Sequence, residues 1–171
     1  QSIPIAEFVL GYALHHSQDI ALREAAQQAG EWKPHRFAEL WHSRWLIVGY
    51  GHIGRNVAKR ASAFDAHVTV ARRTQGAVPF VDAVIPPEDI LSELANTDVV
   101  VLACPATDAT RGMANHAFFA AMKPDALLVN VARGSLVDDA ALATALAPGQ
   151  PAPAPLYPLL AEPIPSNRPP W

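Results

Sequence analysis

The order of hydrophobic and polar residues divides the chain into apolar runs and segments with helical spacing. Runs that are almost wholly apolar predict strands at 45–48, 67–71, 98–104 and 126–132. Apolar residues recurring at helical spacing predict helices at 5–13, 19–29, 55–64, 88–95, 115–122 and 138–146. Strands that are apolar on both faces and alternate with helices are typical of a covered parallel sheet. The pattern therefore predicts an α/β fold, a Rossmann-type doubly wound parallel sheet with right-handed crossovers.

The two ends of the chain differ from this single domain. Residues 1–44 predict a helical arm, residues 45–149 the Rossmann body, and residues 150–171 a proline-rich tail. Nine of the sixteen prolines lie between positions 148 and 170. Because proline cannot donate to a sheet ladder, we expect no central strand there. The tryptophans at 32, 41 and 45 are expected to pack either against a partner subunit or in the chain's own core.

Composition narrows the classes of function. Half of the 171 residues are hydrophobic and 17% are charged, so one sizeable core can form. The net charge of −3 gives no excess of positive charge for binding nucleic acid. The apolar runs are too short to cross a bilayer, no signal peptide opens the sequence, and the single Cys104 fits a reducing compartment. We therefore expect a cytoplasmic protein without membrane or nucleic-acid partners.

A phosphate-binding pattern lies at the end of the first apolar run. Gly49, Gly51 and Gly54 form G-x-G-x-x-G between a predicted strand and a predicted helix. The first glycine allows a tight turn, the second lets a pyrophosphate approach the backbone, and the third permits close helix–strand packing. The N–H groups and the positive dipole end of the helix then hold the phosphates. The motif therefore predicts a dinucleotide site.

The residues after the second strand bear on the choice of dinucleotide. An acid about 20 residues after the motif would bind the ribose 2′-hydroxyl of NAD, but Arg72 and Arg73 stand there. Guanidinium groups bind phosphate through charge-assisted hydrogen bonds, which predicts NADP, with NAD as the alternative. One such bond, worth ~1.5–3 kcal/mol, favours NADPH over NADH by about tenfold to a hundredfold. The competing interpretation is that both arginines are solvated surface charges.

A third arginine follows the last apolar run. Arg133 lies at the edge where open α/β sheets bind ligands. A guanidinium there can clamp a substrate carboxylate and polarise an adjacent carbonyl that accepts a hydride. The alternative is an arginine that caps helix carbonyls or pairs with Asp138 or Asp139.

Four stretches in this order resemble the D-isomer-specific 2-hydroxyacid dehydrogenases. They are the helix start at 5–7, the glycine motif at 49–54, PATDATRG at 105–112, and MKP at 122–124 leading to NVARGSLVD at 130–138. The resemblance covers about residues 2–149 and implies a nicotinamide-dependent, reversible reduction of a 2-keto acid to a D-2-hydroxy acid. The arginines after the second strand are similar to those of NADP-preferring glyoxylate/hydroxypyruvate reductases. Residues 5–45 match the region that forms a homodimer interface in the family.

The resemblance also implies roles for single residues. His52 and Ile53 would contact the pyrophosphate, with Arg72 and Arg73 at the adenosine end. Arg133 would be the catalytic arginine that binds the substrate beside the cofactor. The other residues implied to line the cofactor cleft are Cys104, Pro105, Thr110, Val131 and Ala132. Because no activating partner is apparent, the cysteine is expected to be a wall residue and no nucleophile.

The tail departs from the family pattern. Glu162 keeps the place of the acid that tunes the catalytic histidine, but Tyr157 replaces an aspartate that meets the nicotinamide carboxamide. The family's histidine follows soon after the tryptophan matched by Trp171, and none of the seven histidines here has that context or metal-ligand spacing. The family's N-terminal substrate domain has no counterpart. We therefore expect a fragment in which residues 150–171 are the remnant of a catalytic segment, and which retains at most nucleotide binding.

Two other interpretations stay open. A non-catalytic nucleotide-binding or dimerisation module with a degenerate site is favoured by Tyr157 and opposed by Arg133 and Glu162. Another Rossmann enzyme of the adenosylhomocysteinase-like kind also has G-Y-G-x-x-G, but the N-V-A-R-G stretch at 130–134 argues against it.

Overall fold

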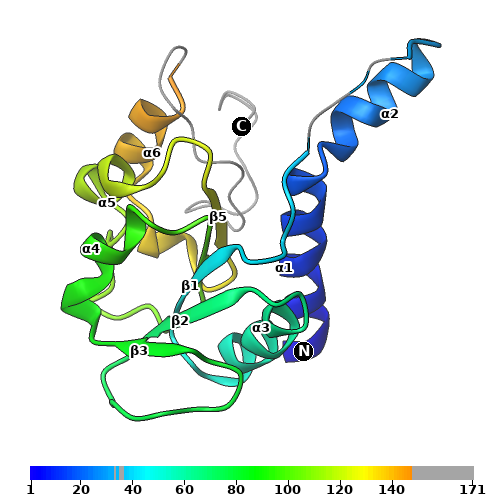
Figure 1. Cartoon of the computed structure of the whole chain (residues 1–171). Coiled ribbons are helices and arrows are strands. Elements are labelled where there is room, and N and C mark those ends of the chain that lie inside the picture. The colour runs from blue at the N-terminus through cyan, green and yellow to red at the C-terminus, as the bar shows by residue number, and fades with distance from the viewer. Residues whose placement is uncertain (33, 35–36, 148–171) are drawn as a thin grey trace.

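A five-stranded parallel sheet forms the centre of the protein (Figure 1). The computed structural model describes residues 1–32, 34 and 37–147. The strands are β1 (Arg44–Val48), β2 (His67–Ala71), β3 (Ala83–Ile85), β4 (Val99–Leu102) and β5 (Leu127–Asn130). They lie in the order β3-β2-β1-β4-β5, and every pairing is parallel. This is the doubly wound Rossmann arrangement that the apolar runs predict.

Helices cover both faces of the sheet (Figure 1). They are α1 (Ser2–Ser17), α2 (Ile20–Gln28), α3 (His52–Ser62), α4 (Ile90–Leu94), α5 (His116–Ala121) and α6 (Asp139–Ala145), with 3₁₀ turns η1 (Pro87–Asp89) and η2 (Gly134–Leu136). The helices α1 and α3 lie on one face, and α4, α5 and α6 lie on the other. None of the helices in the described part of the chain is long and apolar enough to span a bilayer.

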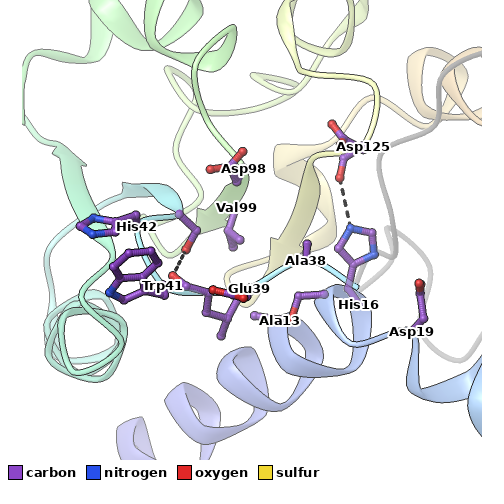
Figure 2. Close-up of a pocket in the computed structure, with 13 residues that line it drawn as sticks. Ala13, His16, Asp19, Ala38, Glu39, Trp41, His42, Asp98, Val99 and Asp125 are labelled. Atoms are coloured by element: carbon purple, nitrogen blue, oxygen red, sulfur yellow. Dashed lines mark hydrogen bonds between the residues drawn. The ribbon is translucent and has the colours of Figure 1, made fainter. Parts of the chain in front are cut away.

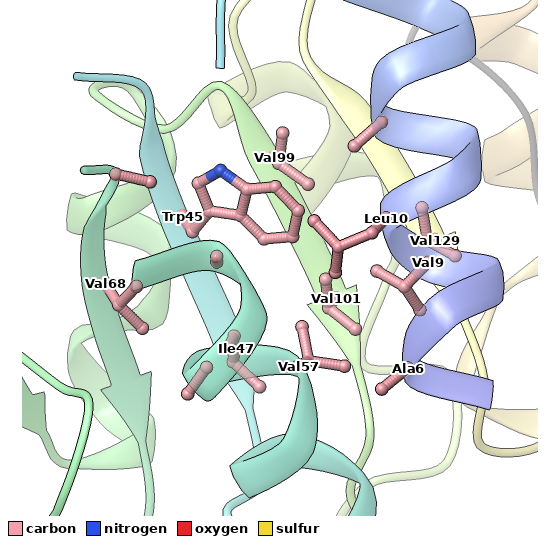
Figure 3. Packing of buried hydrophobic residues seen from close by; sticks show 14 of the residues in the cluster. Ala6, Val9, Leu10, Trp45, Ile47, Val57, Val68, Val99, Val101 and Val129 are labelled. Atoms are coloured by element: carbon pink, nitrogen blue, oxygen red, sulfur yellow. The ribbon is translucent and has the colours of Figure 1, made fainter. Parts of the chain in front are cut away.

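Two hydrophobic clusters lie on the two faces of the sheet. Figure 3 shows the first, in which Trp45 and Ile47 of β1 pack with Leu10 of α1. Leu46 and Val48, the alternate residues of the same strand, belong to the second cluster with α4, α5 and α6. Successive strand side chains point to opposite faces. A strand covered on both faces therefore needs the continuous apolar run seen in the sequence.

The N-terminal segment is divided between the body and a projecting helix. The helix α1 packs against α3 and buries Ala6 and Ala13, so it is a layer of the Rossmann body. By contrast, α2 has no buried residue and extends away from the body (Figure 1). Trp45 is buried in the chain's own core, whereas Trp41 is 59% exposed and Trp32 is 93% exposed. Own-core packing thus accounts for only one of these three tryptophans.

The predicted strands are confirmed, and the structure adds two short elements. The strand β3 has three half-buried residues at an edge of the sheet, which is too short for a recognisable periodicity. The turn η2 occupies the segment just after Arg133. The helix predicted at 88–95 is divided into η1 and α4. The tail at 150–171, for which no central strand is expected, lies outside the described residues.

Candidate functional site

The carboxyl ends of four strands meet in one row across the sheet. Val48 of β1 pairs with Ala71 of β2 and with Leu102 of β4, and Leu102 in turn pairs with Asn130 of β5. The residues that follow these positions therefore share one edge: Gly49, Arg72, Cys104, Val131, Ala132 and Arg133. The chain order reverses between β1 and β4, and open α/β sheets bind ligands at such a switch point. Glu162, the other predicted catalytic residue, lies outside the described residues.

Gly49 and Gly54 have no room for a side chain. Gly49 has a φ of 99°, and a Cβ on it would lie 2.8 Å from the Cα atom of Cys104, so the turn after β1 rests on the chain leaving β4. A Cβ on Gly54 would lie 2.1 Å from the carbonyl oxygen of Gly49, which holds α3 against the end of β1. A Cβ on Gly51 would meet nothing within 4 Å. Two glycines thus permit close packing, and the third leaves the backbone bare where a pyrophosphate would approach.

The helix α3 begins at this bare turn. Gly51 is its N-cap and makes no side-chain hydrogen bond to the first turn. His52 is exposed, Ile53 is half-buried, and no acidic residue occupies the first turn. The positive end of an 11-residue helix and its main-chain N–H groups are therefore available to an anion. The observed glycine geometry fits a dinucleotide pyrophosphate.

Two arginines follow β2 at the same edge. Arg72 is half-buried, and its main-chain N–H donates to the oxygen of Ile85 in β3 at 3.0 Å. Its guanidinium carbon lies 5.9 Å from the centre of the Tyr50 ring. Arg73 is exposed. Within the described ranges, neither arginine has a carboxylate at ion-pair distance, so both charges are available to an anionic ligand.

A buried asparagine holds the loop that carries Arg133. Asn130 is fully buried; its side-chain oxygen accepts from the N–H of Ala132 at 3.0 Å, and its Nδ2 donates to the oxygen of Arg133 at 2.8 Å. The exposed guanidinium of Arg133 donates to the oxygen of Ala132 at 2.7 Å. Asp138, one alternative partner from the sequence, instead caps α6 by accepting from two N–H groups. Asn130 is not among the site residues predicted from the sequence, although a lone polar residue at the end of an apolar run was a usable signal.

The loop after β4 is closed by a threonine. The hydroxyl of Thr110 donates to the oxygen of Pro105 at 2.8 Å and accepts from the N–H of Thr107 at 2.8 Å. This hydroxyl therefore shapes the loop. Cys104 is half-buried at the start of the loop, with its Sγ 3.9 Å from the Sδ of Met113. Burial raises the pKa of the Cys104 thiol, which favours its neutral form. A neutral thiol is a poor nucleophile, which agrees with a residue that only lines the cleft.

A cavity of about 500 Å³ lies at the opposite, amino edge of the sheet (Figure 2). Its walls come from α1, the segment before β1, and the starts of β4 and β5. In it, Nε2 of His16 is 3.1 Å from the oxygen of Asp125. Asp98 accepts from the N–H of Arg44 at 2.7 Å and pairs with Lys123. The cavity is thus remote from the glycine turn. The features that indicate a nucleotide site are the glycine geometry and the start of α3 at the carboxyl edge.

Comparison with protein families decides the assignment. Residues 10–171 match the model of the D-isomer specific 2-hydroxyacid dehydrogenase NAD binding domain. The chain belongs to this family. Members of the 2-hydroxyacid dehydrogenase family are NAD(P)-dependent oxidoreductases, and the glycine turn described above lies inside the matched domain.

Curated relatives in the family carry two kinds of name. Glyoxylate reductase of Pyrococcus furiosus is 37% identical over 136 residues, which cover 71% of this chain and 39% of that protein. D-3-phosphoglycerate dehydrogenase of Methanocaldococcus jannaschii is 33% identical over 158 residues, which cover 87% of this chain and 29% of that protein. The chain therefore spans less than half the length of either relative.

Solved structures of the family share the fold. A D-isomer specific 2-hydroxyacid dehydrogenase from Xanthobacter autotrophicus Py2, in complex with NADPH and MES, is 34% identical with a TM-score of 0.88 over 98% of this chain and 69% of that one. A family protein from Aeromonas salmonicida is 29% identical with a TM-score of 0.90 over 96% of this chain and 53% of that one. The chain therefore has the nucleotide-binding fold of 2-hydroxyacid dehydrogenases.

Proposed function

We propose that this chain is the cofactor-binding domain of an NADP-preferring oxidoreductase that reduces 2-keto acids to D-2-hydroxy acids. The observation that carries the NADP preference is Arg72, which stands at the end of β2 with no carboxylate partner among the described residues. A carboxylate there would repel a 2′-phosphate, whereas a guanidinium binds one through charge-assisted hydrogen bonds. The 34% identical relative in complex with NADPH supports the same choice.

The chain's own residues would divide the work of binding and orientation. The N–H groups at the start of α3 would hold the pyrophosphate, and the bare backbone at Gly51 would let it approach. When bound, the nicotinamide ring supplies or accepts a hydride. Cys104 and Val131 would border its cleft, since both follow strands at the row of carboxyl ends.

Arg133 is proposed to bind the carboxylate of the keto acid. Its side chain is exposed at the carboxyl edge, and one of its N–H donors is used at the oxygen of Ala132. A guanidinium has five N–H donors, so enough remain for a bidentate contact with a carboxylate. Glu162 is proposed to adjust the pKa of a histidine that donates the proton. This role rests only on the position of Glu162 in the family's sequence pattern.

The cofactor part of the proposal is tested by binding. The 171-residue chain is titrated with NADPH and with NADH, and tryptophan fluorescence reports the two dissociation constants. We expect NADPH to bind more tightly by about tenfold or more, and Arg72→Ala to remove most of that preference. Arg23→Ala on the projecting α2 is the matched control and should leave the ratio unchanged. A preference for NADH would overturn the proposal.

The substrate part is tested in the full-length enzyme. We expect Arg133→Ala to lower kcat/KM for glyoxylate or hydroxypyruvate by about a hundredfold or more, because a charge aimed at the reacting substrate is lost. A pure nucleotide sensor would have no reductase activity to lose. Unchanged kcat/KM in the variant would remove Arg133 from the proposed mechanism.

We also propose that two copies associate through the N-terminal segment. Apolar side chains of that segment are exposed in one copy: Phe8, Tyr12, Leu22, Trp32, Phe37 and Trp41. Aromatic residues are enriched in protein interfaces. Light scattering should give the mass of a dimer, and Leu22→Glu should give the mass of a monomer. Leu91→Glu, at an exposed leucine of α4 on the other face, is the matched control and should stay dimeric. A monomeric wild type would contradict the proposal.

A further inference from the structure

The second residue of the glycine turn contacts the arginine that follows β2. Tyr50 lies between Gly49 and Gly51, and its ring centre is 5.9 Å from the guanidinium carbon of Arg72. Both side chains are half-buried at the carboxyl edge of the sheet. A guanidinium within about 6 Å of an aromatic ring face is attracted by the ring's electrons. The turn that would hold the pyrophosphate is therefore linked by a cation–π interaction to the arginine that would hold the 2′-phosphate.

The ring of Tyr50 is itself anchored. Its hydroxyl donates to the main-chain oxygen of Pro79, in the loop that joins β2 to β3. Burial raises the pKa of this hydroxyl, while Arg55 and Arg72 act in the opposite direction, so the hydroxyl stays protonated as a donor at neutral pH. This hydrogen bond therefore holds the ring against the loop that begins at Arg72 and joins β2 to β3.

The same loop has a hydrogen bond of its own and a further interaction with α3. The side chain of Gln75 donates to the main-chain oxygen of Arg72 at 3.1 Å. The ammonium of Lys59 in α3 lies 5.9 Å from the centre of the Phe80 ring. Phe80 has a φ of 64°, a conformation that bulky residues adopt only where surrounding contacts impose it. These contacts make the loop a fixed support for the Tyr50 hydroxyl.

A cation–π interaction suits an arginine that must bind phosphate. The ring attracts the charge of the guanidinium and is no conventional acceptor, so the five N–H donors remain available to a ligand. An unrestrained arginine loses rotamer freedom when it binds a ligand, which weakens binding. A ring that already restricts Arg72 reduces this loss. The benefit applies to a ligand with a 2′-phosphate and not to one with a 2′-hydroxyl.

We propose that Tyr50 is a positioning residue that holds Arg72 for the 2′-phosphate and thereby strengthens discrimination between NADPH and NADH. This inference rests on the proposed NADP preference. Tyr50 acts through the arginine, so it sets the ratio of the two affinities. Its anchor on Pro79 and its ring over Arg72 are separate contributions, and the anchor can be removed while the ring is kept.

The experiment measures dissociation constants of the 171-residue chain for NADPH and NADH. Tyr50→Leu removes both the ring and the anchor, and we expect the preference for NADPH to fall by about two- to fivefold. Tyr50→Phe keeps the ring and loses the hydroxyl, and it should reduce the preference less. Circular dichroism checks that each variant is folded, and Tyr50→Phe preserves the test if Tyr50→Leu does not fold.

A double-mutant cycle separates positioning from a general structural effect. In an Arg72→Ala background, Tyr50→Leu should leave the ratio of affinities unchanged, because the residue through which Tyr50 acts is absent. Phe64→Leu is the matched control, since it removes an exposed ring just after α3 that takes no part in the Tyr50 and Arg72 interactions described above. It should also leave the ratio unchanged.

The outcomes distinguish this inference from the proposed function. If Arg72→Ala lowers the preference for NADPH and Tyr50→Leu does not, the inference is wrong and the NADP proposal stands. An equal fall with Phe64→Leu would also overturn it, because the effect would then not depend on the ring beside Arg72. If Arg72→Ala itself leaves the ratio unchanged, both the NADP proposal and the inference fail.

Discussion

The side chain of Asn130 donates a hydrogen bond to the main-chain oxygen of Arg133 at 2.8 Å. The same side chain accepts from the N–H of Ala132 at 3.0 Å, and it is fully buried. Both ends of one amide are therefore used to shape the loop that presents the guanidinium. A buried amide with both groups satisfied specifies one loop conformation.

Loss of that amide should destabilise the fold. Asn130→Ala leaves an N–H group and a carbonyl without their partner, and we expect a decrease of about 1–3 kcal/mol in the free energy of unfolding. Urea denaturation measures the change. Asn96→Ala, at an exposed asparagine, is the control and should change stability by less than about 0.5 kcal/mol. Equal stability of Asn130→Ala and the wild type would show that the loop keeps its conformation without the two hydrogen bonds of Asn130.

Gly54 and Gly51 should respond differently to the same substitution. In Gly54→Ala the new Cβ would lie 2.1 Å from the oxygen of Gly49, a backbone atom that cannot move aside easily. We expect a loss of about 1–3 kcal/mol in the free energy of unfolding and weaker nucleotide binding. Thermal unfolding and NADPH titration measure the two effects.

Gly51→Ala is the matched variant, because a Cβ there meets nothing within 4 Å of the protein. Its stability should fall by at most about 1 kcal/mol, the cost of a poorer N-cap. Nucleotide affinity should nevertheless fall sharply, because the added methyl group would occupy the path of the pyrophosphate. An NADPH affinity of Gly51→Ala equal to that of the wild type would mean that the pyrophosphate does not bind at Gly51.

Cys104 should react slowly with alkylating reagents. Burial raises the pKa of its thiol, so less thiolate is present at a given pH than in the unfolded chain. The rate of iodoacetamide labelling, followed by mass spectrometry, should be lower in the native protein than in urea, and its pH midpoint should be higher in the native protein than in urea. Saturating NADPH should slow it further if the thiol borders the cofactor. Faster labelling of the native protein would indicate an activated thiolate.

The Lys123–Asp98 ion pair should contribute stability that is lost at high pH. Its hydrogen bond to Asp98 raises the pKa of Lys123, so the folded value lies above the unfolded one. Stabilisation is then complete below the unfolded-state pKa of about 10.4 and disappears as the pH rises through the folded value. Because the pair is partly exposed, we expect at most about 1 kcal/mol.

Lys123→Met tests this relationship. The variant should be less stable than the wild type at about pH 8, and the difference should shrink as the pH rises past the unfolded-state pKa of about 10.4 and the wild-type ammonium loses its proton. Urea unfolding across the pH series provides the measurement. A difference that stayed constant with pH would attribute the effect to packing of the lysine stem.

Much of the fold could be predicted because its signals are local. A strand covered on both faces must be apolar at every position, which made β1, β4 and β5 visible as continuous runs. The glycine turn was predictable because Gly49 and Gly54 have no room for a Cβ atom, and Gly51 leaves the backbone bare for a ligand. The positions of Arg72 and Arg133 followed from strand ends alone, since the carboxyl ends of parallel strands share an edge.

Only the tertiary structure determined which partner each polar group has. The strand β3 forms because its main chain can pair with the edge of β2. The helix α1 belongs to the Rossmann domain because its apolar side packs against α3 and the sheet. The contact of Tyr50 with Arg72 and its hydrogen bond to Pro79 join residues 22 and 29 positions apart, and no local pattern encodes such pairs. The sequence determined the elements and the edge where the site lies, because periodicity and backbone chemistry are local properties. The tertiary structure decided how its arginines are held, because that depends on side chains brought together by folding.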